Sequence, residues 1–162
     1  MTKRYYVVDT GYLLELFKVD GHSNDSTHQA IDEKFKQAAH QGFQFYVPVS
    51  VLFELANHIA HINNGYRRKQ LAERLAKTVE SCVKDKMPWI ITPCKELAAI
   101  EQLTETLLKF SNEYSIQGLG LTDTSVLLEA EKLSKKYRQH GYKVHIWTTD
   151  NALKALAPDA EE

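Results

Sequence analysis

Four acidic residues of this 162-residue chain lie where an apolar segment begins or ends. They are Asp9 in YYVVDT, Glu54 in VSVLFEL, Asp123 in LGLTDTSVLLEA and Asp150 in VHIWTTDNAL. A carboxylate among apolar residues is costly unless it is protonated, paired with a cation or bound to a metal ion. Because the four positions span the sequence, a shared carboxylate cluster that binds a divalent cation is the simplest explanation.

Oxygen ligands of this kind suit Mg²⁺ or Mn²⁺, which keep several water molecules in an octahedral shell. Such an ion can lower the pKa of a bound water, orient it and stabilise the charge that develops on a phosphoryl group. This chemistry requires no nucleophilic Ser, Cys or Lys. We therefore expect hydrolysis of a phosphodiester bond in nucleic acid. Without the ion, clustered carboxylates should raise one another's pKa.

Segments with strand and helix patterns alternate along the chain, which predicts a three-layer α/β/α fold. Its mostly parallel central sheet should have about four to five strands. Tyr5, Tyr6, Trp89 and Trp147 are expected in the core, and Ser26 or Thr27 as the cap of a helix. The expected strands cover residues 5–8, 43–47, 89–92 and 144–148, and the expected helices 12–17, 30–40, 50–60, 66–86, 95–110, 123–140 and 152–156.

This fold would bring the acidic residues together, because sites in open parallel sheets form at the carboxyl ends of the strands. Asp9 and Asp150 each follow a predicted strand directly. Glu54 lies in the first turns of the helix after the second strand. Asp123 opens a helix, where negative charge is favoured. Ordinary topology thus predicts one acidic pocket at one edge of the sheet.

Composition indicates a cytoplasmic protein with a single domain over residues 1–157 and a frayed tail over 158–162. The sequence has neither a secretory signal pattern nor an apolar run long enough to span a membrane. A formal net charge of −1 gives no overall attraction to nucleic acid. Local charge could supply it, and we expect Arg67, Arg68 and Lys69 to contact RNA phosphates.

Four segments, YYVVDTGYLLELF, VPVSVLFELANHI, LGLTDTSVLLEAEKL and VHIWTTDNALKAL, resemble the PIN-domain ribonucleases, which include the toxins of many toxin–antitoxin pairs. The resemblance implies that Asp9 and Asp123 hold the metal ion most directly. It implies that Glu54 and Asp150 complete the acidic pocket, directly or through water, and that Thr148 supports it. RNA as substrate, a protein antitoxin and a homodimer are further implications of the same resemblance.

The sequence departs from the family pattern at two places. Gly11 stands where the family commonly has Asn or Ser, so a polar contact from that position is missing. Residues 124–127 offer no further acid, which weakens a second metal site.

Three alternatives remain open from the residues. A PIN-like fold could serve as a non-catalytic adaptor that holds RNA or a protein. A phosphatase of the haloacid-dehalogenase type also places an Asp after the first strand, but it needs a second Asp where this chain has Gly11. Glu54, His58 and His61 share one helix face, which is either a transition-metal site or an exposed helix edge.

Overall fold

The computed structural model describes residues 2–93 and 99–161 of the chain. In these residues the strands form one four-stranded sheet in the order β3-β2-β1-β4, and every neighbouring pair is parallel. This arrangement confirms the α/β fold and the parallel sheet that the sequence predicts. The strands are β1 Arg4–Val8, β2 Gln44–Pro48, β3 Ile90–Thr92 and β4 Lys143–Trp147.

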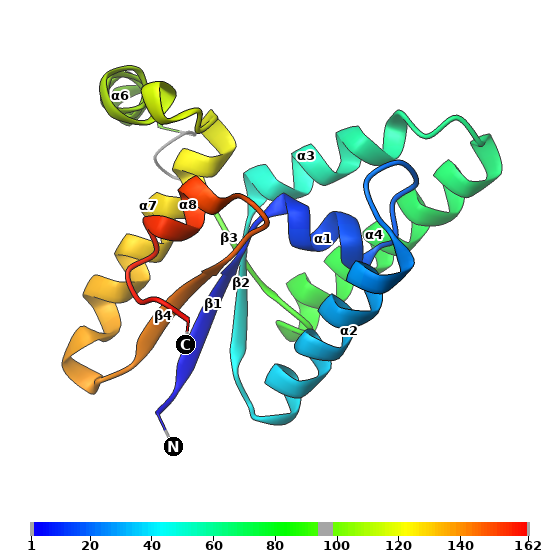
Figure 1. Cartoon of the computed structure of the whole chain (residues 1–162), viewed down its shortest axis with the longest axis horizontal. Coiled ribbons are helices and arrows are strands. Elements are labelled where there is room, and N and C mark those ends of the chain that lie inside the picture. Colours follow the sequence, from blue (N-terminus) through cyan, green and yellow to red (C-terminus); the bar gives the residue numbers. More distant parts are fainter. Residues whose placement is uncertain (1, 94–98, 162) are drawn as a thin grey trace.

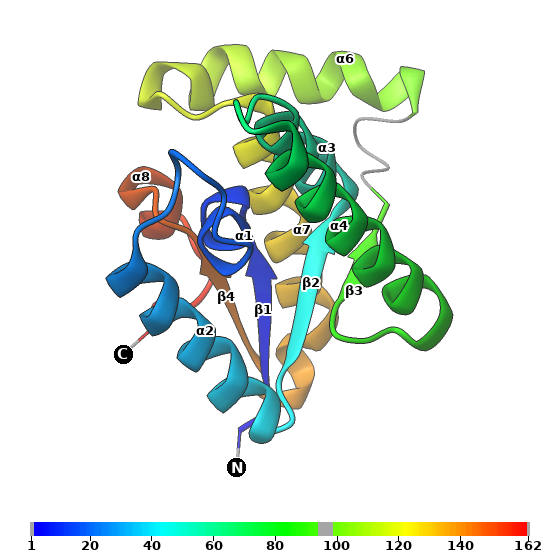
Figure 2. The same ribbon diagram turned by 90° about the vertical axis from the view of Figure 1, so that its right-hand side faces the viewer.

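Helices flank the sheet, as Figures 1 and 2 show. Helices α1, α2 and α4 cover one face, α7 covers the other, and α6 lies beyond the carboxyl ends of the strands (Figure 2). None of the helices in the described ranges is both long and apolar enough to cross a membrane. Their bounds are α1 Thr10–Leu16, α2 Asp25–His40, α3 Val49–Ala60, α4 Gly65–Asp85, α6 Ile100–Lys109, α7 Leu121–Tyr137 and α8 Asn151–Ala155, with single turns at Phe110–Tyr114, Ser115–Gln117 and Arg138–His140.

Strands β1, β2 and β4 are buried on both faces, which explains why their sequences are continuous apolar runs rather than alternating ones. Aromatic rings fill the space between the sheet and α2. The ring centroid of Trp147 lies 4.2 Å from that of Tyr6, 5.1 Å from Phe35 and 5.4 Å from Phe45. Tyr5, Tyr6, Trp89 and Trp147 are all buried, so their expected place in the core is confirmed.

Helices α1, α2 and α7 each begin two or more residues earlier than the sequence predicts, and at α2 the difference comes from capping. Helix α2 starts at Asp25, and its cap is Asn24, whose Oδ1 accepts a 2.9 Å hydrogen bond from the Thr27 amide. The expected caps, Ser26 and Thr27, instead lie inside the first turn. Helix α7 starts at Leu121 after Gly120. The first four residues of the helix expected over 95–110, residues 95–98, lie outside the described residues.

Asp159 and Glu161 are hydrogen-bonded to β4, whereas the sequence predicts a frayed tail over 158–162; residue 162 lies outside the described residues. The Asp159 amide donates to the Val144 carbonyl (3.1 Å), and Asp159 Oδ2 accepts from the Val144 amide (2.7 Å). Glu161 accepts hydrogen bonds from Trp147 Nε1 (3.0 Å) and Lys34 Nζ (2.9 Å). The physical reason is that a strand edge and a buried indole N–H both require partners.

The tail contact gives a stability prediction. We expect Glu161→Ala to lower the free energy of unfolding by about 2 kcal/mol, because the buried Trp147 N–H loses its acceptor and Lys34 its ion pair. Thermal and urea unfolding would measure this change. Glu73→Ala is the control, because its ion pair with Lys69 is exposed and should contribute less than about 0.5 kcal/mol. Equal effects of both variants would contradict a structural role for the tail.

Candidate functional site

The sequence-predicted acidic residues lie on elements that meet at the carboxyl edge of the sheet. Asp9 follows β1 and caps α1, and Asp150 follows β4 and caps α8. Because β1 and β4 are neighbouring parallel strands, their carboxyl ends lie side by side. Glu54 lies in α3, after β2, and Asp123 lies in the first turn of α7. Helices α3 and α7 contact each other, which places their residues beside this edge.

Asp9 is the most buried of the four, with 6% of its surface exposed. Its Oδ1 accepts a hydrogen bond from the Thr10 amide (2.7 Å), and its Oδ2 accepts one from Thr148 Oγ1 (2.8 Å). The pKa of Asp9 is raised to about 6, chiefly by burial; the two hydrogen bonds oppose this rise, and the negative charges of Asp123 and Glu54 add to it. Asp9 therefore lies within the electrostatic field of two other carboxylates.

Thr148 joins Asp9 to Asp150. Its hydroxyl donates to Asp9 and accepts a hydrogen bond from the Asp150 amide (3.0 Å). Asp150 in turn caps α8, because its Oδ1 accepts from the amides of Ala152 (2.7 Å) and Leu153 (3.0 Å). The three residues form a hydrogen-bonded chain that orients the acids at the ends of β1 and β4.

The other two acidic residues, Asp123 and Glu54, are carried by helices α7 and α3. Asp123 Oδ2 accepts a 2.7 Å hydrogen bond from the Gly120 amide at the start of α7. Burial raises the pKa of Asp123, and the charges of Asp150 and Glu54 add to this effect. Glu54 Oε2 accepts a 3.2 Å hydrogen bond from Thr10 Oγ1, the residue directly after Asp9. All four acidic residues are thus linked by mutual repulsion or by hydrogen-bonded neighbours.

No lysine or arginine in the described ranges forms an ion pair with Asp9, Asp123 or Asp150. The group therefore carries uncompensated negative charge, and its donors are all oxygen, which is the chemistry of a hard divalent cation. However, no three acidic, histidine or cysteine side chains in the described part stand close enough to surround one ion. A closed four-carboxylate shell is not formed. The residues fit an ion that is bound by one or two carboxylates and keeps several waters, as Mg²⁺ does.

Three hydroxyl residues near the acids were not anticipated from the sequence as part of the site. Thr10, which is 4% exposed, orients Glu54. Ser50 Oγ and Ser125 Oγ lie 2.6 Å apart and join the starts of α3 and α7. The sequence offered only one indication of their role, namely that they stand directly after an acid or at a helix start. Their partners, Glu54 for Thr10 and Ser125 for Ser50, are distant in sequence and could not be predicted.

The structure also explains Gly11. A β-carbon at this position would lie 2.4 Å from Thr149 Oγ1, so the Thr149 side chain occupies the space that a larger residue would need. A hydroxyl from the loop after β4 thus lies beside position 11, where the sequence has no polar side chain. Beside Glu54, a surface hollow of about 440 Å³ is lined by Ser50, Phe53, Asn57 and Thr122.

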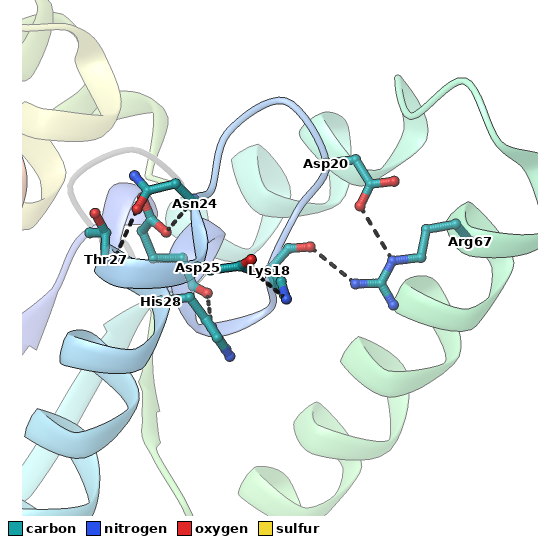
Figure 3. Close-up of polar contacts among 8 residues, drawn as sticks. Lys18, Asp20, Asn24, Asp25, Thr27, His28 and Arg67 are labelled. Atoms are coloured by element: carbon teal, nitrogen blue, oxygen red, sulfur yellow. Dashed lines mark hydrogen bonds and ion pairs between the residues drawn. The ribbon is translucent and has the colours of Figure 1, made fainter.

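The basic residues expected to bind RNA are engaged within the chain. Arg67 donates from Nη2 to the Lys18 carbonyl (3.1 Å) and from Nε to Asp20 (3.4 Å), as Figure 3 shows. Arg68 donates to the Ile62 carbonyl (3.1 Å), and Lys69 pairs with Glu73 at 3.8 Å. Contact of these residues with RNA stays a prediction, and Arg67 has a structural partner that such contact would have to replace.

The structure groups the histidines differently from the possible metal site of Glu54, His58 and His61. His61 does not join Glu54 and His58, because its Nδ1 contacts the Asn57 carbonyl of its own helix at 2.6 Å. His58 instead faces His22, which lies between α1 and α2, with 3.2 Å between His58 Nδ1 and His22 Nε2. Of the two alternatives for this helix face, a metal site made of Glu54, His58 and His61 is therefore not formed in the described residues.

We compared the sequence with known protein families and with curated proteins. No model of a known protein family matches the sequence, and no curated protein matches it either. The interpretation of the site therefore rests on its residues and on the fold.

Proposed function

We propose that this chain is a Mg²⁺- or Mn²⁺-dependent endoribonuclease with a PIN-like fold. The observation that carries the proposal is the buried Asp9 carboxylate, which shares its electrostatic environment with Asp123 and Glu54 and has no cationic partner in the described residues. Burying like charges together destabilises a fold, and such strain is typical of a functional site. The order of strands and acids, and the four segments quoted above, agree with this family.

Each residue has a defined part in the proposal. Asp9 and Asp123 would hold the ion, with Glu54 and Asp150 contacting its waters. Thr148 fixes the Asp9 carboxylate, and the Thr10 hydroxyl fixes Glu54. When bound, the ion would supply an activated water and stabilise charge on the scissile phosphate. The hollow beside Glu54 is where a strand of RNA would approach the acids.

The proposal also includes the two protein partners that the resemblance implies, an antitoxin and a second copy of the chain. An antitoxin would block the acidic pocket or its entrance, and a second copy of the chain would form a homodimer. Phe53, which borders the hollow beside Glu54, is 74% exposed, and Leu108 of α6 is 57% exposed. These two side chains would be available for contact with such a partner.

The test is cleavage of fluorescently labelled single-stranded RNA by the purified chain. We expect cleavage with Mg²⁺ or Mn²⁺, none in EDTA, and little cleavage of DNA of the same sequence. Recovery of activity when Mn²⁺ is restored after EDTA would separate loss of metal from loss of fold. RNA binding without cleavage under any of these metals would favour the non-catalytic adaptor instead.

A further inference from the structure

Two histidines that are distant in sequence meet beside the acidic group. His22 Nε2 lies 3.2 Å from His58 Nδ1, and their ring centroids are 4.4 Å apart. Imidazole nitrogens are favoured ligands of Zn²⁺, Ni²⁺ and Cu²⁺. Two nitrogens bound to a tetrahedral Zn²⁺ at its usual bond length are separated by about 3.3 Å. The facing nitrogens therefore already have the spacing of a ligand pair.

The other nitrogen of His58 faces a carboxylate. His58 Nε2 lies 3.9 Å from Glu54 Oε1, one turn away on α3. A metal-bound histidine commonly donates its free ring N–H to a carboxylate, which fixes the ring and makes it a better ligand. Glu54 stands in that position, and a small movement of either side chain would close the hydrogen bond.

The loop that carries His22 is anchored on both sides. On one side, Arg67 of α4 donates to the Lys18 carbonyl and to Asp20 (Figure 3). On the other side, Lys18 forms a 2.6 Å ion pair with Asp25 at the start of α2. Within the loop, the His22 amide donates to the Val19 carbonyl at 3.0 Å. His22 is thus held in place before any ligand arrives, which lowers the entropy cost of binding.

We propose that His22 and His58 form a binding site for a transition-metal dication such as Zn²⁺, with Glu54 orienting His58 from behind. The described residues provide no third protein ligand, so water must complete the coordination. A site of this kind is open and exchangeable, unlike the closed four-ligand sites that hold structural zinc. It differs from the acidic pocket in its ligands, which are nitrogen rather than oxygen.

Isothermal titration calorimetry with ZnCl₂ tests the site. The protein should be the full, untagged chain in excess Mg²⁺, so that neither a tag nor the acidic group competes for Zn²⁺. We expect one equivalent of Zn²⁺ to bind. His22→Ala and His58→Ala should each weaken binding by roughly tenfold or more, since a ligand should matter at least as much as an outer hydrogen-bond partner. Arg67→Gln, which releases the loop, should weaken binding by a smaller factor.

His61→Ala is the matched control, because His61 caps the same helix but its Nδ1 contacts the Asn57 carbonyl rather than His22 or Glu54. It should bind Zn²⁺ as the wild type does. Circular dichroism of each variant shows whether it is folded. The proposal is overturned if the wild type binds no Zn²⁺, or if His61→Ala loses as much affinity as His58→Ala. Because the readout is binding without RNA, the result is independent of the proposed nuclease activity.

Discussion

Replacing Asp9 with asparagine should abolish metal-dependent RNA cleavage and should also stabilise the metal-free protein. Removing a ligand carboxylate from a divalent-metal site is expected to lower cleavage by at least about a hundredfold. The stabilisation follows from the raised pKa of Asp9, about 6 in the folded chain against 3.8 for the unperturbed group. Keeping this carboxylate charged in the folded state at neutral pH costs about 3 kcal/mol, which a neutral amide avoids.

The asparagine amide can keep the existing contacts. Its oxygen can accept from the Thr10 amide, and its nitrogen can donate to Thr148 Oγ1, which then acts as an acceptor. We therefore expect a net gain of about 2 kcal/mol in EDTA at neutral pH, or roughly 5 °C in the melting temperature. Differential scanning calorimetry measures the gain, and the RNA assay measures the loss of activity.

The control for Asp9→Asn is Asp32→Asn, because the partly exposed Asp32 carboxylate forms a surface ion pair with Lys36, one turn along α2. It should change neither activity nor melting temperature by a measurable amount. If Asp9→Asn is destabilising in EDTA and still cleaves RNA at the wild-type rate, Asp9 is a structural cap and the proposed site is wrong.

The second large effect concerns the pH dependence of stability. Without metal, the acidic residues should destabilise the protein as the pH rises, whereas the stabilisation by Mg²⁺ should grow with pH. In EDTA, the folded state holds the Asp9 proton more tightly than the unfolded state does, because its folded pKa is raised. The contribution of Asp9 to stability is therefore most favourable below about pH 4 and is lost as the pH rises to about 6. Asp123, whose pKa is also raised, changes stability in the same direction.

With Mg²⁺ present, protons and metal compete for the same carboxylates. Cleavage at limiting Mg²⁺ should therefore fall by about tenfold for each pH unit below 6. The gain in free energy of unfolding that Mg²⁺ produces, about 2.7 kcal/mol at a hundred times its dissociation constant, should shrink over the same range, and the rise in melting temperature with it. Measuring wild type and Asp9→Asn side by side removes the contributions of all other groups. A flat Mg²⁺ effect between pH 5 and 7.5 would show that these acids do not hold the ion.

The sequence by itself determined the elements and the edge at which the acids lie. Apolar runs of strand length defined β1, β2 and β4, since burial on both faces of a parallel sheet requires such runs; Asp9 ends the first, Pro48 the second and Thr148 the last. Asp9 and Asp150 follow strands directly, so their placement at the carboxyl edge needed only the parallel topology.

The tertiary structure alone decided which side chains meet. Thr148 and Asp9 are 139 residues apart, and Thr10 and Glu54 are 44 apart, and each pair depends on which strands and helices are neighbours. The same holds for His22 with His58 and for Glu161 with Trp147. The physical reason is that local patterns fix backbone conformation within a few residues, whereas hydrogen bonds between distant side chains form only after the sheet order brings their elements together.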